Sequence, residues 1–192
     1  ASDADAIIDL HTGSPEMQTH TVYLRGDDAS RQLAEAFGTD LLLAEAAGDE
    51  ADTEWDERNF GGKLRVAATR AGIPSITPEL GSNKQLDDDA IQAGLDGLFG
   101  VFRHLGLLAD DPDPWDGVRA RNHLGRVRAA DSGLFVPDAA AELGADVDAG
   151  ETFGTVYDPA TYEPLQIVTA DRAGVVYSIA REATVTAGQT LV

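Results

Sequence analysis

The sequence predicts an α/β domain followed by a small all-β domain, and three observations lead to this fold class. Over the first half of the chain, short apolar runs alternate with segments of helical periodicity. Residues 110–115 are rich in proline and aspartate and suit a domain boundary. After Val118, glycine and proline interrupt short runs of valine, threonine, isoleucine and tyrosine, as in all-β domains. We expect an α/β domain over residues 1–114 and a β domain over residues 115–192.

The expected elements of the first domain follow from hydrophobic periodicity and from residues that start or stop helices. Strands are expected at Ala6–Asp9, Thr21–Arg25, Asp40–Leu43 and Ile73–Thr77. Helices are expected at Ser30–Phe37, Lys63–Ala71 and Asp88–His104. The strand, helix and strand around Lys63–Ala71 predict a crossover with parallel pairing.

Two of these helices carry clear end signals. Asp28 is the expected N-cap of the first helix, and Gly38 is its expected C-terminal stop. The longest helix begins in an acidic run at residues 87–89, which favours the positive end of the helix dipole. Its apolar face, which we expect to pack on the core, consists of Ile91, Leu95, Leu98, Phe99 and Phe102.

The charge of the chain is its most unusual global property. It has 34 acidic and 14 basic residues among 192, a net charge of -20, and its only lysines are Lys63 and Lys84. Such a surface repels phosphates, so no nucleic acid partner is expected. A carboxylate excess spread over both domains is typical of a halophilic protein, because concentrated salt screens the self-repulsion.

The composition also bounds metal chemistry and location. The chain has no cysteine, so a metal site would have to use histidine, aspartate and glutamate. No apolar run approaches the roughly 20 residues that a membrane helix needs, so we expect no membrane partner and a cytoplasmic location.

Polar residues follow two of the expected strands where α/β folds place their chemistry, at the carboxyl end. The run Ile7-Ile8 leads into Asp9, His11 and Gly13, and the run that starts at Ile73 leads into Glu79. A histidine ligand and a glutamate base would suit a metal hydrolase, although a histidine after a strand can also be an ordinary surface residue. Asp9 lies on the same face as His11, so it could orient the ring or merely cap backbone groups at the strand end.

These motifs resemble a known family. Asp9-Leu10-His11-Thr12-Gly13, then Glu79-Leu80-Gly81 after an isoleucine-proline strand, then a glycine-punctuated β unit, are similar to the succinylglutamate desuccinylase/aspartoacylase family of the zinc carboxypeptidase clan. The resemblance covers nearly the whole chain. It implies a partial zinc-carboxypeptidase-like domain with a mixed or parallel sheet, and zinc-dependent hydrolysis of the amide bond of an N-acyl amino acid. It implies that His11 is the third zinc (Zn2+) ligand and Glu79 the general base.

The chain departs from the family pattern in one important respect. The family takes its other two zinc ligands from an upstream His-x-x-Glu motif, and it uses arginine and asparagine residues to hold the substrate carboxylate. The residues three positions after the four histidines of this chain are Ser14, Tyr23, Leu107 and Arg126. We therefore expect a C-terminal portion of the enzyme, inactive by itself. A noncatalytic binding or assembly module and a carboxypeptidase are the alternatives.

The C-terminal tail resembles a biotinyl or lipoyl barrel-sandwich over residues 132–192, with recurring turns at 147–152 and 170–176. A carrier role would need a lysine, and none follows Lys84, so a structural or site-covering role is expected. A basic cluster near the boundary could bind an anion or pair with local carboxylates; it consists of Arg119, Arg121, Arg126 and Arg128. The sequence leaves open the acyl group, the amino acid, the residues that bind them and whether the protein is a homo-oligomer.

Overall fold

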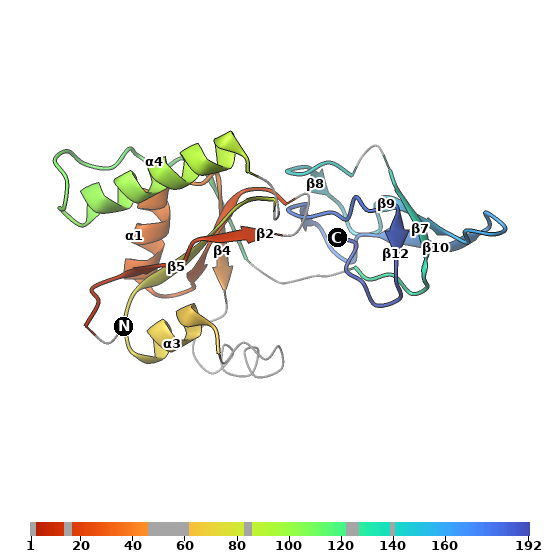
Figure 1. Cartoon of the computed structure of the whole chain (residues 1–192), viewed down its shortest axis with the longest axis horizontal. Coiled ribbons are helices and arrows are strands. Elements are labelled where there is room, and N and C mark those ends of the chain that lie inside the picture. The colour runs from red at the N-terminus through yellow and green to blue at the C-terminus, as the bar shows by residue number, and fades with distance from the viewer. Residues whose placement is uncertain (1–2, 14–16, 46–61, 83–85, 122–126, 139–140) are drawn as a thin grey trace. The chain divides into compact units, whose positions relative to one another are not determined.

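The computed structural model describes residues 3–13, 17–45, 62–82, 86–121, 127–138 and 141–192 (Figure 1). The chain divides into two compact units, one of Ala1–Gly13 with Thr19–His123 and the other of Ser14–Gln18 with Leu124–Val192. Within the described ranges, no helix is long and apolar enough to cross a membrane.

The first unit is a mixed α/β structure built around a six-stranded sheet. Its strands are β1 (Ile7–Ile8), β2 (His11–Gly13), β3 (His20–Leu24), β4 (Leu41–Glu45), β5 (Ser75–Ser82) and β6 (Val118–Arg121). Its helices are α1 (Asp28–Phe37), α3 (Leu64–Arg70) and α4 (Asp88–His104). The strand order is β1-β5-β3-β4-β6, and β2 also pairs with β5. Figure 1 shows α1 and α4 on one side of the sheet and α3 on the other.

β3, α1 and β4 form a parallel crossover, because β3 and β4 are parallel neighbours. The expected parallel pairing of β5 after α3 is wrong. β5 is antiparallel to β3 and is parallel to β1 and β2 on its other side. The physical reason is that strands β1 and β2, distant in sequence, offer β5 its parallel partners, and the local order of elements carries no information about them.

Helix α1 begins at Asp28, two residues before the expected Ser30, and its N-cap lies one residue earlier than expected. The Asp27 carboxylate accepts hydrogen bonds from the backbone N–H groups of Ala29 and Ser30, at 3.0 and 3.2 Å. Asp27 is therefore the N-cap, and the prediction that placed Asp28 there is wrong, because Asp28 already lies in the helix. The stop at Gly38 is confirmed, since this residue has the left-handed φ of 83° that ends many helices.

Helix α4 has the expected bounds but turns a different face to the core. Ile91, Leu95 and Phe99 of the expected core face are 49%, 45% and 45% exposed. The buried residues of the helix are instead Gly94, Gly97, Gly100 and Val101. The glycines allow a close approach to α1: a Cβ atom at position 97 would lie 2.5 Å from the Phe37 ring. The gain from close backbone packing overrides the apolar stripe.

The second unit is built from short antiparallel strands. They are β7 (Gly133–Pro137), β8 (Asp146–Val147), β9 (Thr152–Tyr157), β10 (Pro164–Thr169), β11 (Gly174–Val175) and β12 (Thr184–Val185). Four of them form a sheet in the order β10-β9-β7-β12, and β11 pairs with β8. A buried core that includes Phe135, Phe153, Val156 and Ile179 holds the unit together. The barrel-sandwich type of this domain stays a prediction.

The segment after the expected boundary at residue 114 belongs to the first unit. β6 pairs in parallel with β4, and the Val118 N–H donates to the carbonyl of Asp40 at 2.8 Å. The chain therefore divides later than expected.

The arginines of the basic cluster lie in different units. Arg119 lies on β6, donates to Glu35 Oε1 at 2.5 Å and covers the Trp115 ring at 4.7 Å. Arg128, in the second unit, donates to the carbonyl of Gly188 at 2.7 Å. Arg119 thus pairs with a local carboxylate, whereas Arg126 lies outside the described residues.

Candidate functional site

The structure brings together the three side chains that the sequence singles out. His11 Nε2 lies 3.1 Å from Asp9 Oδ2, and His11 Nδ1 lies 3.4 Å from Glu79 Oε1. The side chains of Asp9, His11 and Glu79 are 24%, 40% and 21% exposed. One imidazole therefore sits between two carboxylates at a place that solvent can reach.

Strand pairing explains why these residues meet. β1 and β2 both run parallel to β5, so Asp9, just after β1, and His11, the first residue of β2, lie beside the second half of β5. Ile8 pairs with Ile76, and the Asp9 N–H donates to the Ile76 carbonyl at 3.0 Å. His11 pairs directly with Glu79. The register of two apolar strands thus places both carboxylates beside the ring.

The hydrogen-bond chemistry of this group is informative. A carboxylate only accepts hydrogen bonds, so the contact with Asp9 assigns the ring proton of a neutral His11 to Nε2. Nδ1 is then a hydrogen-bond acceptor, and it faces a carboxylate oxygen of Glu79, which is also an acceptor. This contact is favourable only when a proton or a cation lies between the two atoms. The contact also supports the interpretation that Asp9 orients the ring.

The group does not by itself make a complete metal site. A catalytic zinc ion takes three protein ligands and keeps one position for water. In the part of the chain that the structure describes, no group of three histidine, aspartate or glutamate side chains is placed to hold a metal ion. His11 can supply one ligand, so the described residues do not fit a zinc ion without further donors.

An apolar cavity of about 430 Å³ borders this group. Apolar side chains from the strand ends and from α4 form most of its lining, namely Leu10, Leu80, Leu86, Ile91, Leu95 and Leu98. His11 and Thr12 also line it. The cavity therefore adjoins the exposed apolar face of α4.

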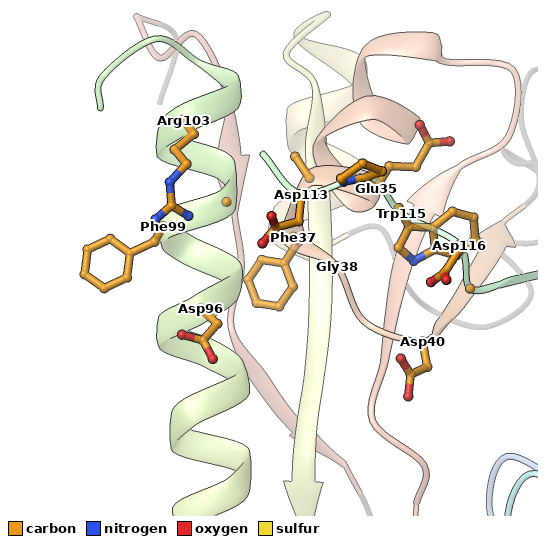
Figure 2. A pocket seen from close by; sticks show the side chains of 14 residues that line it. Glu35, Phe37, Gly38, Asp40, Asp96, Phe99, Arg103, Asp113, Trp115 and Asp116 are labelled. Atoms are coloured by element: carbon orange, nitrogen blue, oxygen red, sulfur yellow. The ribbon is translucent and has the colours of Figure 1, made fainter. Parts of the chain in front are cut away.

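A second cavity, of about 390 Å³, lies in the same unit but away from the predicted residues (Figure 2). Figure 2 shows Asp96, Phe99 and Arg103 on α4, with Phe99 pointing away from α1. The other carboxylates that line this cavity come from α1 and from the segments after α1 and α4; they are Glu35, Asp40, Asp113 and Asp116. No sequence motif indicates this cavity, because its residues come from segments that only the fold brings together.

Among the carboxylates that line the second cavity, Glu35 has a pKa below its ordinary value. Partial burial raises the pKa of Glu35, but hydrogen bonds from Arg31 and Arg119 outweigh this effect and hold the pKa below its usual range. Nearby, the Trp115 Nε1–H donates to the Thr39 carbonyl at 2.8 Å. These contacts tie the wall of the cavity to the sheet.

The first unit also contains a histidine to which the sequence assigns no role. His20 lies on β3, directly opposite Glu79 and on the side away from His11. It is 3% exposed. No spacing motif marks it, because its relation to Glu79 arises from antiparallel pairing.

The first unit of the chain matches a known protein family. The family model described as the succinylglutamate desuccinylase/aspartoacylase catalytic domain matches residues 1–105, more than half of the chain. No curated protein sequence matches the chain.

Solved structures share the fold. A succinylglutamate desuccinylase/aspartoacylase from Rhodobacter sphaeroides is 24% identical with a TM-score of 0.78, and the match covers 98% of this chain and 56% of that chain. The product-bound ectoine utilization protein EutE (DoeB) from Ruegeria pomeroyi is 21% identical with a TM-score of 0.81, covering 98% and 57%. This chain spans little more than half the length of these proteins. The domain match and the shared fold agree, and the chain belongs to the succinylglutamate desuccinylase/aspartoacylase family.

Proposed function

We propose that this chain is part of a zinc-dependent amidohydrolase that cleaves the amide bond of an N-acyl amino acid. Membership of a family of desuccinylases and aspartoacylases supports hydrolase activity in general, without specifying the substrate or the metal. The observation that carries the more specific proposal is the placement of His11 between Asp9 and Glu79, where β2 pairs in parallel with β5. The acyl group and the amino acid stay open.

Glu79 is the proposed general base. Its carboxylate is partly exposed and lies beside His11, so a water molecule can approach it. The carboxylate takes a proton as the water oxygen attacks the acyl carbonyl, and it returns the proton to the amine nitrogen as the amide bond breaks. Asp9 accepts from His11 Nε2 and holds the ring in place.

His11 is the proposed zinc ligand, through Nδ1. Because the described residues supply one such ligand and zinc needs about three, the remaining donors must come from elsewhere in the active enzyme. We expect this chain alone to bind zinc weakly. Tight, stoichiometric binding of zinc in calorimetry would contradict that expectation.

The test of Glu79 needs the complete, zinc-loaded protein. Glu79→Gln should lower kcat by about 100-fold or more, because a general base contributes about that much, while the zinc content is unchanged. Glu182→Gln is the matched control, since Glu182 is an exposed glutamate of the second unit. Turnover that survives Glu79→Gln would sink the assignment.

A second candidate function is a noncatalytic binding or assembly module. The single histidine of the described group favours it. A panel of N-acyl amino acids and peptides separates the possibilities. Hydrolysis of N-acyl amino acids supports a deacylase, and hydrolysis of peptides supports a carboxypeptidase. If neither kind of substrate is hydrolysed, the result supports the noncatalytic module.

The net charge of -20 supports a further proposal about habitat, namely that the protein works in a cytoplasm of high salt. Salt screens repulsion among the carboxylates, so the free energy of unfolding should rise as KCl is added. Urea unfolding at several KCl concentrations measures this dependence. A free energy of unfolding that is unchanged between dilute and concentrated KCl would oppose the proposal.

A further inference from the structure

We propose that His20 is a positioning residue of the site, which holds the Glu79 side chain in place from its buried side. The inference rests on the proposed function, in which Glu79 is the base. Its starting point is a row of three residues across adjacent strands. His11 on β2, Glu79 on β5 and His20 on β3 are direct pairing partners, with Glu79 in the centre.

The core shows that Glu79 and His20 point to the same face of the sheet. Ile76 and Leu80 of β5 pack in the core with α1 and α4, and so does Tyr23 of β3. Side chains alternate along a strand, so Glu79 and His20 both point to the opposite face. Directly opposed residues of an antiparallel pair have Cβ atoms about 5 Å apart. The imidazole of His20 is therefore the side-chain neighbour of Glu79 on β3.

Burial gives the two histidines of this row different tasks. His11 is 40% exposed and Glu79 is 21% exposed, whereas His20 is 3% exposed. Solvent and substrate can thus reach the Glu79 carboxylate from the side of His11. On the β3 side, the buried His20 blocks access to the carboxylate. A fixed inner neighbour limits the rotamers of the base and keeps its oxygens directed outward.

The surroundings of Glu79 make this neighbour important. Along β5, the nearest residues that share its face are Thr77 and Gly81, and neither carries a charge. The Thr77 hydroxyl is buried and has no hydrogen-bond partner among the described residues, so it does not hold the carboxylate. On the β3 side, the polar residue opposite Glu79 is His20.

His20 is not proposed as a metal ligand. The described residues contain no group of three side chains placed to bind a metal ion, although His11, Glu79 and His20 lie in one row. The inferred role is exerted through Glu79, and its test must therefore report on the carboxylate as well as on turnover.

The first experiment uses nuclear magnetic resonance on this chain without substrate or metal. In Glu79→Gln, the ring signals of both His11 and His20 should shift, because each lies beside the altered group. His104 is the internal control, since it is exposed at the end of α4. Shifted His11 signals with unchanged His20 signals would overturn the proposal.

The second experiment follows the carboxyl carbon of Glu79 in variants of His20. His20→Leu keeps bulk but removes every polar atom, and it should shift this signal; His20→Gln restores an N–H donor and should return the signal toward its original position. An unchanged carboxyl signal in folded His20→Leu would overturn the inference. If that variant does not fold, His20→Gln and the reciprocal Glu79→Gln experiment decide.

The zinc-loaded complete enzyme supplies the kinetic readout. His20→Leu should lower kcat about 10-fold or more with little change in KM, as loss of a supporting group does, and His20→Gln should recover part of the loss. An unchanged kcat in His20→Leu would refute the positioning role. The resonance measurements need no turnover, so an inactive wild-type enzyme would refute the proposed function while leaving the structural result for His20 to stand or fall separately.

Discussion

Replacing Gly100 by alanine should destabilise the first unit, even though alanine is the better helix former. Gly100 lies on the face of α4 that packs against α1, and an added Cβ atom would overlap the backbone carbonyl oxygen of Ala36. A backbone atom cannot rotate away as a side-chain end can. The two helices must therefore separate locally, or the variant must lose part of their packing.

The structure sets the sign and size of the effect. Alanine gains about 1 kcal/mol over glycine in a helix interior. Overpacking costs about 1–3 kcal/mol, and a rigid backbone neighbour places Gly100→Ala at the upper end, for a net loss of about 2 kcal/mol. Gly94→Ala is the matched control. Its Cβ atom would meet only Leu80 Cδ1, at 3.0 Å, a side-chain end that can move. The control should be neutral or up to about 1 kcal/mol more stable.

Urea unfolding at constant KCl measures both variants. In a Trp55→Phe background, fluorescence reports Trp115 alone, whose indole N–H donates to the Thr39 carbonyl within the first unit. The free energies of unfolding of Gly100→Ala, Gly94→Ala and the parent are then compared with one common m-value for the urea dependence. Gly100→Ala at or above the stability of the parent would refute the close packing of α4 on α1.

Three further variants probe buried polar contacts and pH. Arg65→Met should cost about 3–5 kcal/mol in urea unfolding, because it leaves the buried Glu45 carboxylate without two hydrogen bonds of 2.5 Å; a loss below about 1 kcal/mol would contradict this. The double variant with Glu45→Leu should recover most of the loss. Ser30→Ala removes the hydroxyl that accepts from the buried Ser75 N–H at 3.1 Å, and it should cost about 1–3 kcal/mol in the same assay, whereas an unchanged midpoint would argue against this bond. Glu35 has a folded-state pKa below its ordinary value of 4.5, so its stabilising contribution is present above that value and is lost as the pH falls through the lower folded-state pKa. Glu35→Gln should flatten the loss of stability as the pH falls below 4.5, and equal slopes for parent and variant would contradict it.

The local sequence was enough to find the exposed part of the candidate site. Asp9 and His11 are two residues apart at the end of an apolar strand, and Glu79 ends another, so pattern and family resemblance both point to them. In the structure Glu79 lies within β5, and the parallel register of β2 against β5 brings His11 beside it. The chemical roles of these residues stay predictions.

His20 could not be found in this way. It lies at the start of β3, whereas Glu79 lies in the middle of β5, and antiparallel pairing is what places them opposite each other. The predicted parallel crossover gave β5 the wrong direction relative to β3, so the sequence did not indicate that His20 and Glu79 are paired. Strand direction depends on partners far away in the sequence.

By itself, the sequence determined the bounds of α4, the glycine stop of α1 and the residues that gather around His11. These features depend on periodicity, end signals and short motifs, which act over a few residues. Only the tertiary structure decided which face of α4 is buried, which unit takes β6 and which residue lies behind Glu79. The physical reason is that each of these outcomes depends on close contact with a distant segment: on α1 for the glycine face, on β4 for β6, and on β3 for the carboxylate of Glu79.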